Sequence, residues 1–279
     1  MEMVKAKVMT LCLLLMAVSG HAQDYKWSSA RMDGSRTGCV SASRDNLEDA
    51  LGEVMDDGSY HAPNGAVYRK GSAVADVAAV VHAAQPKMAR VKEVIAYSEE
   101  EMVTAKHETQ LSNWFVGIVM EKAASLSGKK VDVGICNFGG IRVNMPKGDV
   151  ILDDMLSMFP FKNQVVYLEL KGSELRKIFE TMAATRFQAI GGVEIVAENG
   201  SLTKALIGGE PIDDDRLYGV ATISFLLYGG DSLTLAENAV NMTIFEDVQI
   251  IDAVLEYIAA LNKAGKNITP SSVTYVTVK

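Results

Sequence analysis

The stretch that decides the fold is Val131-Asp-Val-Gly-Ile-Cys-Asn-Phe-Gly-Gly-Ile-Arg142. Its first six residues carry β-branched side chains at every second position and predict a strand. The strand runs directly into a loop in which Gly139 and Gly140 let the backbone approach a ligand closely or take a positive φ. Asn137 can both donate and accept hydrogen bonds, and Arg142 offers a fork of donors suited to phosphate. A tight turn with a surface arginine explains the same residues, so composition alone leaves both interpretations open.

Helices and strands follow one another on both sides of this stretch. Apolar residues at helical spacing predict a helix over 111–126, and alternation predicts a strand over 164–170. Because no regular βαβ repeat occurs, we predict an α+β (mixed α/β) fold, a mixed β-sheet flanked by helices. Further helical segments are expected over 45–54, 71–84, 153–158, 173–182 and 248–264, and further strands over 91–96, 149–152, 192–197, 202–207, 218–222 and 272–278.

Two aromatic segments later in the chain add ligand-binding groups. In Met158-Phe-Pro-Phe161 the proline fixes the backbone, so that Phe161 projects from a loop. In Ser224-Phe-Leu-Leu-Tyr-Gly-Gly-Asp231 a strand ends, and a Gly-Gly turn presents Asp231 after Phe225. Each segment alone is typical of core packing and turns. Together with the amide and guanidinium of the first loop, they provide what is needed to stack a nucleobase, bind ribose hydroxyls and hold a phosphate.

The charge of the chain limits its binding partners. The net charge is −8 at pH 7, and no block of Lys or Arg occurs. Such a chain has no electrostatic reason to bind a nucleic-acid polymer or an anionic membrane. A small phosphorylated ligand remains compatible with this charge, because one or two local arginines suffice to hold it.

The sequence lacks the common catalytic and metal-binding motifs. After residue 22 its histidines are His61, His82 and His107, and none lies in an HxH, HExxH or DxH arrangement. A two-metal phosphatase centre needs several ligands around ions about 3.5–4 Å apart. Nucleophile-elbow, Walker and dinucleotide-binding motifs are also missing. We therefore expect this chain itself to bind no metal and no cofactor.

The first residues indicate export. Lys5 and Lys7 precede an apolar run that is too short to span a bilayer, and small residues follow it. This pattern predicts a signal peptide over 1–22 and a secreted or periplasmic protein that is not inserted in a membrane. Residues 23–89 are expected to form an irregular N-terminal extension packed on a domain of residues 90–279.

Two cysteines remain after the predicted signal peptide, Cys39 and Cys136. In an oxidising compartment they can pair, and they can equally be separate buried thiols, so both alternatives stay open. Neither lies in a CxxC motif, which argues against zinc binding by cysteine.

Several motifs along the chain resemble the C-terminal domain of 5′-nucleotidases, a family that includes UDP-sugar hydrolases and ecto-5′-nucleotidases. The resemblance covers about residues 90–279, and it is specific because the motifs agree with the family in order and spacing. They are Glu108-Thr-Gln-Leu-Ser-Asn113, Asn137–Arg142, Pro146-x-Gly148, Phe159-Pro-Phe161, Leu170-Lys-Gly-Ser-Glu-Leu175, Ile190-Gly-Gly-Val193 and Phe225-Leu-Leu-Tyr-Gly-Gly-Asp231.

This resemblance implies a role for each matching residue. Phe161 and Phe225 would hold the base between them, and Asp231 would bind the ribose hydroxyls. Asn137 would contact the base, and Arg142 would reach the sugar or the phosphate. In the family a preceding metallophosphoesterase domain carries two metal ions, and a domain rotation brings the nucleotide to them. The residues before the match look unrelated to that domain, so divalent metals are expected on a separate secreted metallophosphoesterase partner.

Two positions depart from the family pattern. An arginine that many relatives carry falls at Ala105, beside Lys106, and a usual aspartate falls at Gly117. Lys106 supplies a point charge but cannot grip a phosphate with two parallel hydrogen bonds. These departures favour an alternative function, a non-catalytic secreted ligand-binding or interaction protein. A third interpretation, an independent enzyme that uses Asp231 or His107 in other chemistry, has no pair of titratable groups at suggestive spacing to support it.

Overall fold

The computed structural model describes residues 51–105 and 108–279. The chain forms two compact units, divided between Gln85 and Pro86. The predicted signal peptide, residues 45–50 of the helix predicted over 45–54, and Cys39 lie outside the described residues. The end of that predicted helix is wrong, because Glu53–Val54 pairs with Tyr60–His61 as a strand. The packing of the N-terminal extension on the following domain stays a prediction.

The first unit contains a small antiparallel sheet and a helix. The carboxylate of Asp57 fixes the turn between the first two strands, because it accepts hydrogen bonds from the backbone N and the Oγ of Ser59 at 2.8 and 2.6 Å. A helix over Ala73–Ala84, α3, confirms the helix predicted over 71–84. The sheet has the order β1-β2-β3, with strands β1 (Glu53–Val54), β2 (Tyr60–His61) and β3 (Val67–Tyr68).

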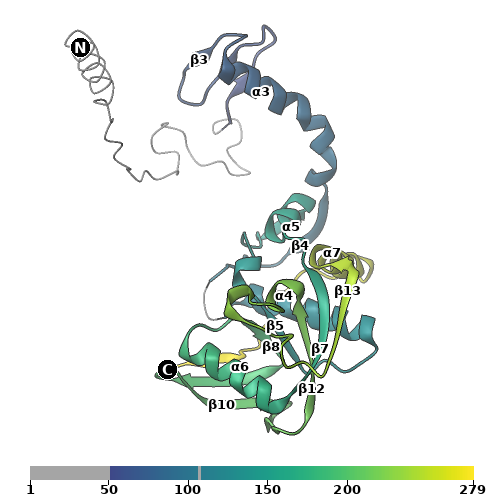
Figure 1. The fold of residues 1–279 in the computed structure, drawn as a ribbon. Helices are drawn as coiled ribbons and strands as arrows, with labels where there is room; N and C mark the ends of the chain where they lie inside the picture. Colours follow the sequence, from purple (N-terminus) through teal and green to yellow (C-terminus); the bar gives the residue numbers. More distant parts are fainter. Residues whose placement is uncertain (1–50, 106–107) are drawn as a thin grey trace, which may run out of the picture. The chain divides into compact units, whose positions relative to one another are not determined.

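The second unit is built around a five-stranded sheet with the order β13-β7-β12-β5-β8 (Figure 1). Strands β5 and β12 pair in parallel, whereas the other three pairs are antiparallel. The predicted mixed sheet and α+β class are therefore confirmed, although β13 and a separate β8 were not predicted. The strands are β5 (Val133–Cys136), β7 (Gln164–Lys171), β8 (Ala189–Gly191), β12 (Leu217–Ile223) and β13 (Asn241–Gln249).

Two smaller sheets complete the second unit. In the four-stranded sheet, with the order β11-β10-β9-β14, the last strand of the chain pairs in parallel with β9. The two-stranded sheet pairs β4 with β6 in antiparallel fashion. The strands are β4 (Val94–Ser98), β6 (Gly148–Ile151), β9 (Val193–Glu198), β10 (Ser201–Ile207), β11 (Glu210–Pro211) and β14 (Val276–Val278).

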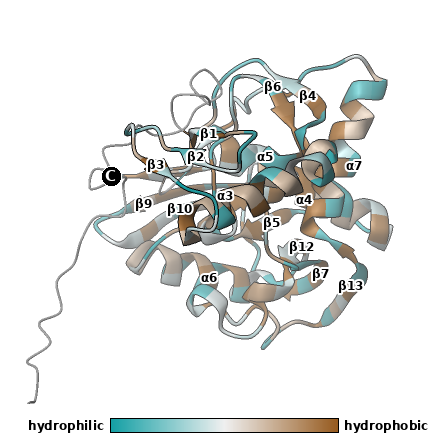
Figure 2. Cartoon of the chain, turned by 90° about the horizontal axis from the view of Figure 1, so that it is seen from above, coloured by the Kyte–Doolittle hydropathy of each residue, from teal (hydrophilic) through white to brown (hydrophobic). Residues whose placement is uncertain are grey.

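Helices pack on these sheets. The longest, α4, contacts β5, β7, β8 and β12. It begins with a capping box between Thr109 and Ser112 and ends at Gly128, whose φ of 65° is left-handed. Hydrophobic and hydrophilic residues are interspersed along α6 and α7, as expected for helices with one buried face (Figure 2). The α-helices are α4 (Gln110–Ser127), α5 (Leu152–Met158), α6 (Gly172–Ala184) and α7 (Ile250–Lys263), and short 3-10 turns are η1 (Gln85–Lys92), η2 (Phe138–Gly140), η3 (Ser224–Leu226) and η4 (Gly230–Ser232).

The core of the second unit lies between the main sheet and its helices. Phe115 of α4, Phe179 of α6 and Tyr218 of β12 are among its largest fully buried side chains. Burial of each such side chain contributes about 1.5–3 kcal/mol. The strands of the sheet and the helices that cover it therefore share one hydrophobic core. Among the described helices, none has the length and apolar character needed to cross a bilayer.

Candidate functional site

Two parallel strands of the main sheet end at the same edge. In the register of β5 and β12, Ile135 lies opposite Thr222, and the Thr222 hydroxyl donates a 2.7 Å hydrogen bond to the Ile135 carbonyl. The chain leaves β5 into Asn137 and leaves β12 into Phe225. Because parallel strands have their carboxyl ends at one edge, these two loops, separated by more than eighty residues in sequence, lie side by side.

Two antiparallel strands begin at that same edge. Val165 of β7 lies opposite Ile223, and Ala189 of β8 lies opposite Cys136. The segment before β7 is tied to the segment after β12, because the backbone N of Gln164 donates to the Oγ of Ser224 at 3.1 Å. The edge therefore receives side chains from four loops: after β5, before β7, before β8 and after β12.

Asn137 is the buried polar residue of this edge. Only 6% of it is exposed, and its Nδ2 donates a 2.9 Å hydrogen bond to Oδ2 of Asp231. Its Oδ1 is buried and has no hydrogen-bond partner among the described residues. An unpaired buried polar atom costs about 1–3 kcal/mol, so the amide is not explained by stability alone.

The two glycines of this loop make room for the Asn137 side chain. A Cβ at Gly140 would lie 2.7 Å from Oδ1 of Asn137, and one at Gly139 would lie 3.3 Å from Nδ2. Neither glycine has a positive φ. The positive φ expected as one reason for these glycines is therefore absent, and the group that the lack of a side chain admits is the protein's own Asn137 amide. Close approach to a ligand stays a prediction.

Phe161 and Phe225 are unusually open for phenylalanine, each 46% exposed. Arg142 lies over the Phe161 ring, with its guanidinium carbon 5.7 Å from the ring centroid, and its Nη1 donates to the Gly139 carbonyl at 3.3 Å. A small hollow beside Phe161 is lined by Gly140 and Ile223, among others. Two half-open aromatic side chains and an exposed guanidinium thus lie on the loops of the same edge as the buried amide.

Asp231 is held in a strained turn. Its φ of 47° and ψ of 33° lie in the left-handed region, which aspartate tolerates better than most residues. Gly230 has no room for a side chain, because a Cβ there would lie 2.0 Å from the carbonyl oxygen of Phe225. The turn therefore fixes the Asp231 carboxylate relative to Phe225. A quarter of the carboxylate side chain remains exposed.

Two residues of this edge were missed by sequence reasoning, Arg186 and Gln188. The guanidinium Nη2 of Arg186 lies 3.7 Å from Oδ1 of Asp231. Gln188 is 3% exposed, and its Oε1 accepts a 3.3 Å hydrogen bond from the backbone N of Phe138. Both residues precede β8, and the antiparallel pairing of that strand with β5 brings them to this edge. Local sequence patterns do not indicate that pairing.

All seven residues predicted for the site lie on these edge loops. Within this set, Asn137 bonds to Asp231 and lies against Gly139 and Gly140, and Arg142 lies over Phe161. Phe225 lies against Gly230, the residue before Asp231. Their roles toward a ligand stay predictions.

The described residues do not supply the ligands of a two-metal centre. Within 51–105 and 108–279, no three His, Cys, Asp or Glu side chains gather where they would hold an ion. His61 lies in β2 and His82 in the last turn of α3, whereas His107 is outside the described residues. Cys136 is buried at the end of β5, and burial raises the pKa of its thiol. Its pairing with Cys39 stays open.

The Glu108–Asn113 motif has a structural role. The Glu108 carboxylate accepts hydrogen bonds from Nδ2 of Asn113 and the backbone N of Tyr275, both at 2.6 Å, and from the backbone N of Val276 at 2.8 Å. Asn113 also donates to the Val273 carbonyl at 2.8 Å. The motif therefore attaches the last strand, β14, to the start of α4.

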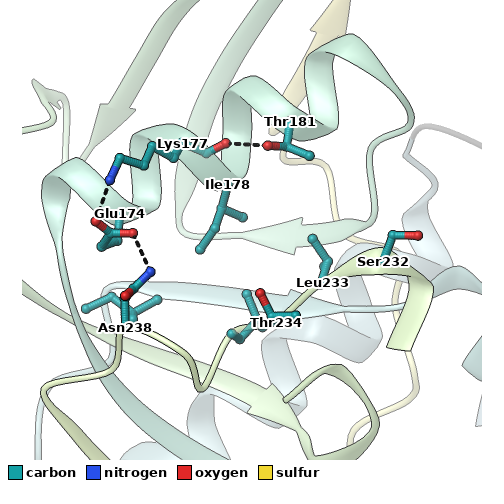
Figure 3. Close-up of a pocket in the computed structure, with 10 residues that line it drawn as sticks. Glu174, Lys177, Ile178, Thr181, Ser232, Leu233, Thr234 and Asn238 are labelled. Carbon is teal, nitrogen blue, oxygen red and sulfur yellow. Dashed lines mark hydrogen bonds and ion pairs between the residues drawn. The ribbon is translucent and has the colours of Figure 1, made fainter. Parts of the chain in front are cut away.

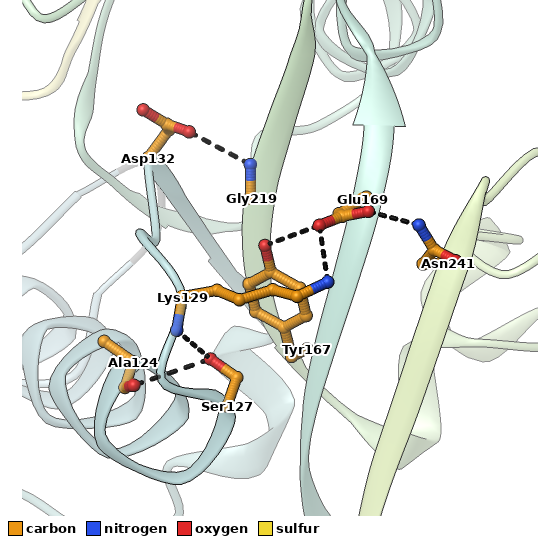
Figure 4. Close-up of polar contacts among 8 residues, drawn as sticks. All are labelled: Ala124, Ser127, Lys129, Asp132, Tyr167, Glu169, Gly219 and Asn241. Carbon is orange, nitrogen blue, oxygen red and sulfur yellow. Dashed lines mark hydrogen bonds and ion pairs between the residues drawn. The ribbon is translucent and has the colours of Figure 1, made fainter.

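A polar cluster closes the opposite edge of the main sheet (Figure 4). Glu169 accepts hydrogen bonds from Nζ of Lys129 at 2.8 Å, from the hydroxyl of Tyr167 at 3.3 Å, and from Asn241. The hydrogen bond from Lys129, followed by that from Asn241, lowers the pKa of Glu169. Burial, followed by the charge of Glu169, raises the pKa of Tyr167 to about 12. This network joins β7 to β13 far from the edge that carries Phe161.

A groove lies between α6 and the segment that follows Asp231 (Figure 3). Its polar groups bond to one another: Glu174 accepts from Nζ of Lys177 at 2.7 Å and from Nδ2 of Asn238 at 3.0 Å. Ile178 and Leu233 supply apolar lining. These contacts hold the segment that follows the strained turn of Asp231 against α6.

Comparison with known proteins identifies the family of this domain. The sequence profile of the family described as 5′-nucleotidase, C-terminal domain, matches residues 94–238, a range that contains every residue of the predicted site. Silent protein UshA(0) of Salmonella typhimurium is 31% identical over 151 residues, which cover 51% of this chain and 27% of that protein. Protein UshA of Escherichia coli is 30% identical over 142 residues, which cover 48% of this chain and 26% of that protein. The chain thus spans about a quarter of the length of these relatives.

A solved structure supports the fold. The 5′-nucleotidase precursor of Thermus thermophilus superposes with a TM-score of 0.64 at 22% sequence identity, over 74% of this chain and 43% of that one. Since the family profile matches more than half of the chain and the same fold recurs in this structure, the chain belongs to the 5′-nucleotidase C-terminal domain family.

Proposed function

We propose that the domain recognises a nucleoside or nucleotide at the edge that carries Asn137, with the base stacked between Phe161 and Phe225. The observation that carries the proposal is the buried Asn137 amide, which is bonded to Asp231 and shares its sheet edge with two phenylalanines that are each 46% exposed. Exposing phenylalanine to water is unfavourable, and a stacked base would cover both rings.

The polar groups of the edge suit the rest of a nucleotide. The Asp231 carboxylate is an acceptor for the two ribose hydroxyls, since the turn holds it with a quarter of its side chain exposed. The second hydrogen of the Asn137 Nδ2 is a donor for the base or the sugar. Arg142 is exposed beside Phe161 and suits a phosphate attached to the sugar.

We further propose that hydrolysis is performed with a separate secreted metallophosphoesterase, which supplies the divalent metals. The described residues offer no donor set for a two-metal centre. The export of the chain is part of the proposal and is supported by the leader-like residues 1–22.

Calorimetry on the full chain tests the binding proposal. Wild type is expected to bind adenosine and AMP, and Phe161→Ala and Phe225→Ala are each expected to weaken binding about tenfold, since stacking contributes about 1–3 kcal/mol per base. Tyr97→Ala is the matched control, because Tyr97 is also 46% exposed but lies in β4. Wild type that binds neither ligand would contradict the proposal and favour the non-catalytic interaction protein.

An assay of phosphate release tests whether hydrolysis needs the separate metallophosphoesterase. The purified chain is expected to release no phosphate from AMP, with or without added Mg²⁺, Mn²⁺ or Zn²⁺. Addition of a metallophosphoesterase that lacks its own nucleotide-binding domain is expected to restore release, and Phe161→Ala in this chain is expected to reduce it. Phosphate release by this chain alone, after chelation of metals, would show that no separate metallophosphoesterase is needed and that the proposal is wrong.

A further inference from the structure

Arg186 is a cation at the candidate site that the proposed function leaves unused. Its side chain is half exposed, and its Nη2 lies 3.7 Å from Oδ1 of Asp231. Among the described residues, Asp231 is its ion-pair partner, and the distance is longer than a charge-assisted hydrogen bond of about 2.7–2.9 Å. Most of the five N–H donors of the guanidinium are therefore available to a ligand.

The Asp231 carboxylate has two differently occupied oxygens. Oδ2 accepts the hydrogen bond from Asn137, and Oδ1 faces Arg186. Arg186 comes from the loop between α6 and β8, whereas Arg142 comes from the loop after β5 and lies over Phe161. The candidate site therefore has one arginine at Phe161 and another at Asp231.

We propose that Arg186 forms a second anion subsite, which favours nucleotides that carry a phosphate on the 2′ or 3′ oxygen of the ribose. The inference rests on the proposed function, because Asp231 must engage the ribose hydroxyls for such a phosphate to lie beside it. When one hydroxyl is esterified, the other still donates to Asp231. The phosphate then lies next to a carboxylate of the same sign, and the guanidinium offsets that repulsion.

The placement of Arg186 suits this task better than a role in stability. An exposed ion pair at this distance contributes about 0–1 kcal/mol to folding. Arg216 provides the comparison within the same chain: it is 49% exposed and its Nη2 lies 3.6 Å from Oδ1 of Asp132. The seven residues of β12 separate Arg216 from Ser224, so it lies roughly 20 Å away from the candidate site, at the other end of that strand.

Calorimetry with the full chain tests the inference, using adenosine, 5′-AMP, 3′-AMP and 2′-AMP. Wild type is expected to bind 3′-AMP or 2′-AMP at least about tenfold more tightly than adenosine. Arg186→Gln is expected to abolish that preference while adenosine affinity stays within about twofold. Arg186→Lys is expected to retain part of the preference, because lysine keeps the charge and loses the fork. Arg216→Gln, the matched control, is expected to change neither.

The outcomes separate this inference from the function on which it rests. If wild type binds adenosine but gains nothing from a 2′ or 3′ phosphate, only the second subsite is wrong. If Arg186→Gln weakens adenosine and 3′-AMP equally, Arg186 supports the fold of the site and is not a subsite. If wild type binds no adenine compound, the proposed function fails and the inference fails with it.

Discussion

At the scale of single residues, the Asn137 side chain limits which residues can replace Gly139 and Gly140. Its amide is wedged between the positions that a Cβ would take at Gly139 and Gly140, and it reaches Asp231 from there. The loop therefore needs small residues because of its own asparagine, independently of any ligand. The two glycines differ in how much space remains, and this difference can be measured.

Gly140→Ala is expected to displace the Asn137 amide, because the new Cβ would lie 2.7 Å from Oδ1. The hydrogen bond to Asp231 is then lost, and we expect about 1–2 kcal/mol of destabilisation in urea unfolding and at least fivefold weaker adenosine binding. Gly139→Ala is the control, since its Cβ meets Nδ2 at 3.3 Å and Gly139 is exposed. Equal effects of the two substitutions would contradict this account.

Tyr167 is expected to make the fold sensitive to alkaline pH. Its pKa is raised from 10 to about 12, so the folded state keeps a phenolic proton that the unfolded chain loses. The stabilisation is complete below pH 10 and disappears as the pH rises toward 12. Urea unfolding of wild type and Tyr167→Phe at pH 8 and pH 11 measures this: the advantage of wild type should shrink at pH 11. A constant difference would show that Tyr167 titrates normally.

The sequence predicted which residues lie at this sheet edge better than it predicted which of them contact one another. Asn137, Phe161, Phe225 and Asp231 stand out in the sequence because loop aromatics and amides follow clear strand and turn patterns. Arg186 did not stand out, because nothing in its neighbourhood indicates which strand the next segment pairs with. Strand order is a long-range property, and local patterns do not contain it.

At the scale of secondary-structure elements, one carboxylate connects the start of α4 to the last strand of the second unit. Glu108 precedes α4, and its oxygens accept backbone hydrogen bonds from Tyr275, just before the last strand, and from Val276, its first residue. The capping box of Thr109 and Ser112 begins α4 immediately afterwards. The start of the helix and the end of the chain are therefore fixed by neighbouring residues.

Glu108→Gln is expected to loosen β14 from the rest of the unit. The amide that replaces one oxygen is a donor and faces a backbone N–H, so one of the bonds to Tyr275 and Val276 is lost. We expect about 1–3 kcal/mol of destabilisation and selective loss of hydrogen-exchange protection at Val276. Glu99→Gln is the control, because Glu99 is exposed and accepts a 3.3 Å bond from Asn267. Unchanged protection at Val276 would contradict the proposed link.

Most elements with an apolar face were predicted within a few residues of their observed bounds. Helix α4 was expected over 111–126 and spans Gln110–Ser127, and β7 was expected over 164–170 and spans Gln164–Lys171. Strand β13 was missed because its residues are mostly polar or partly exposed, so no alternation marks it. The last strand was expected over 272–278 but covers only Val276–Val278, because the preceding residues are joined to Glu108 and Asn113 and do not continue the ladder.

At the scale of the whole molecule, the division between Gln85 and Pro86 sets where the chain can be cut. The segment η1, which begins at Gln85, carries Lys87, Arg90 and Lys92, all exposed. The second unit has its own core and sheets. An exposed segment that joins two compact units is a usual site of limited proteolysis.

Brief digestion with trypsin is expected to release a resistant fragment that begins at Met88, Val91 or Glu93 and ends at Lys279. Mass spectrometry identifies its ends, and calorimetry shows whether adenosine binding survives in it. First cuts after Arg142 or Arg186 would contradict the expected order. Protection of all three sites in η1 would instead support the predicted packing of the N-terminal extension on the domain.

The four loops at one sheet edge have a consequence for how this protein can diversify. The strands that position them are joined by backbone hydrogen bonds, which do not depend on the identity of the loop side chains. Loop residues that bond to another loop, such as Asn137 and Gln188, cannot change separately. A half-exposed loop residue such as Arg186 can change with little effect on the free energy of folding. A lineage with this architecture can change its ligand at such exposed positions first, and the loop before β8, where Arg186 lies, is a natural place for such a change to begin.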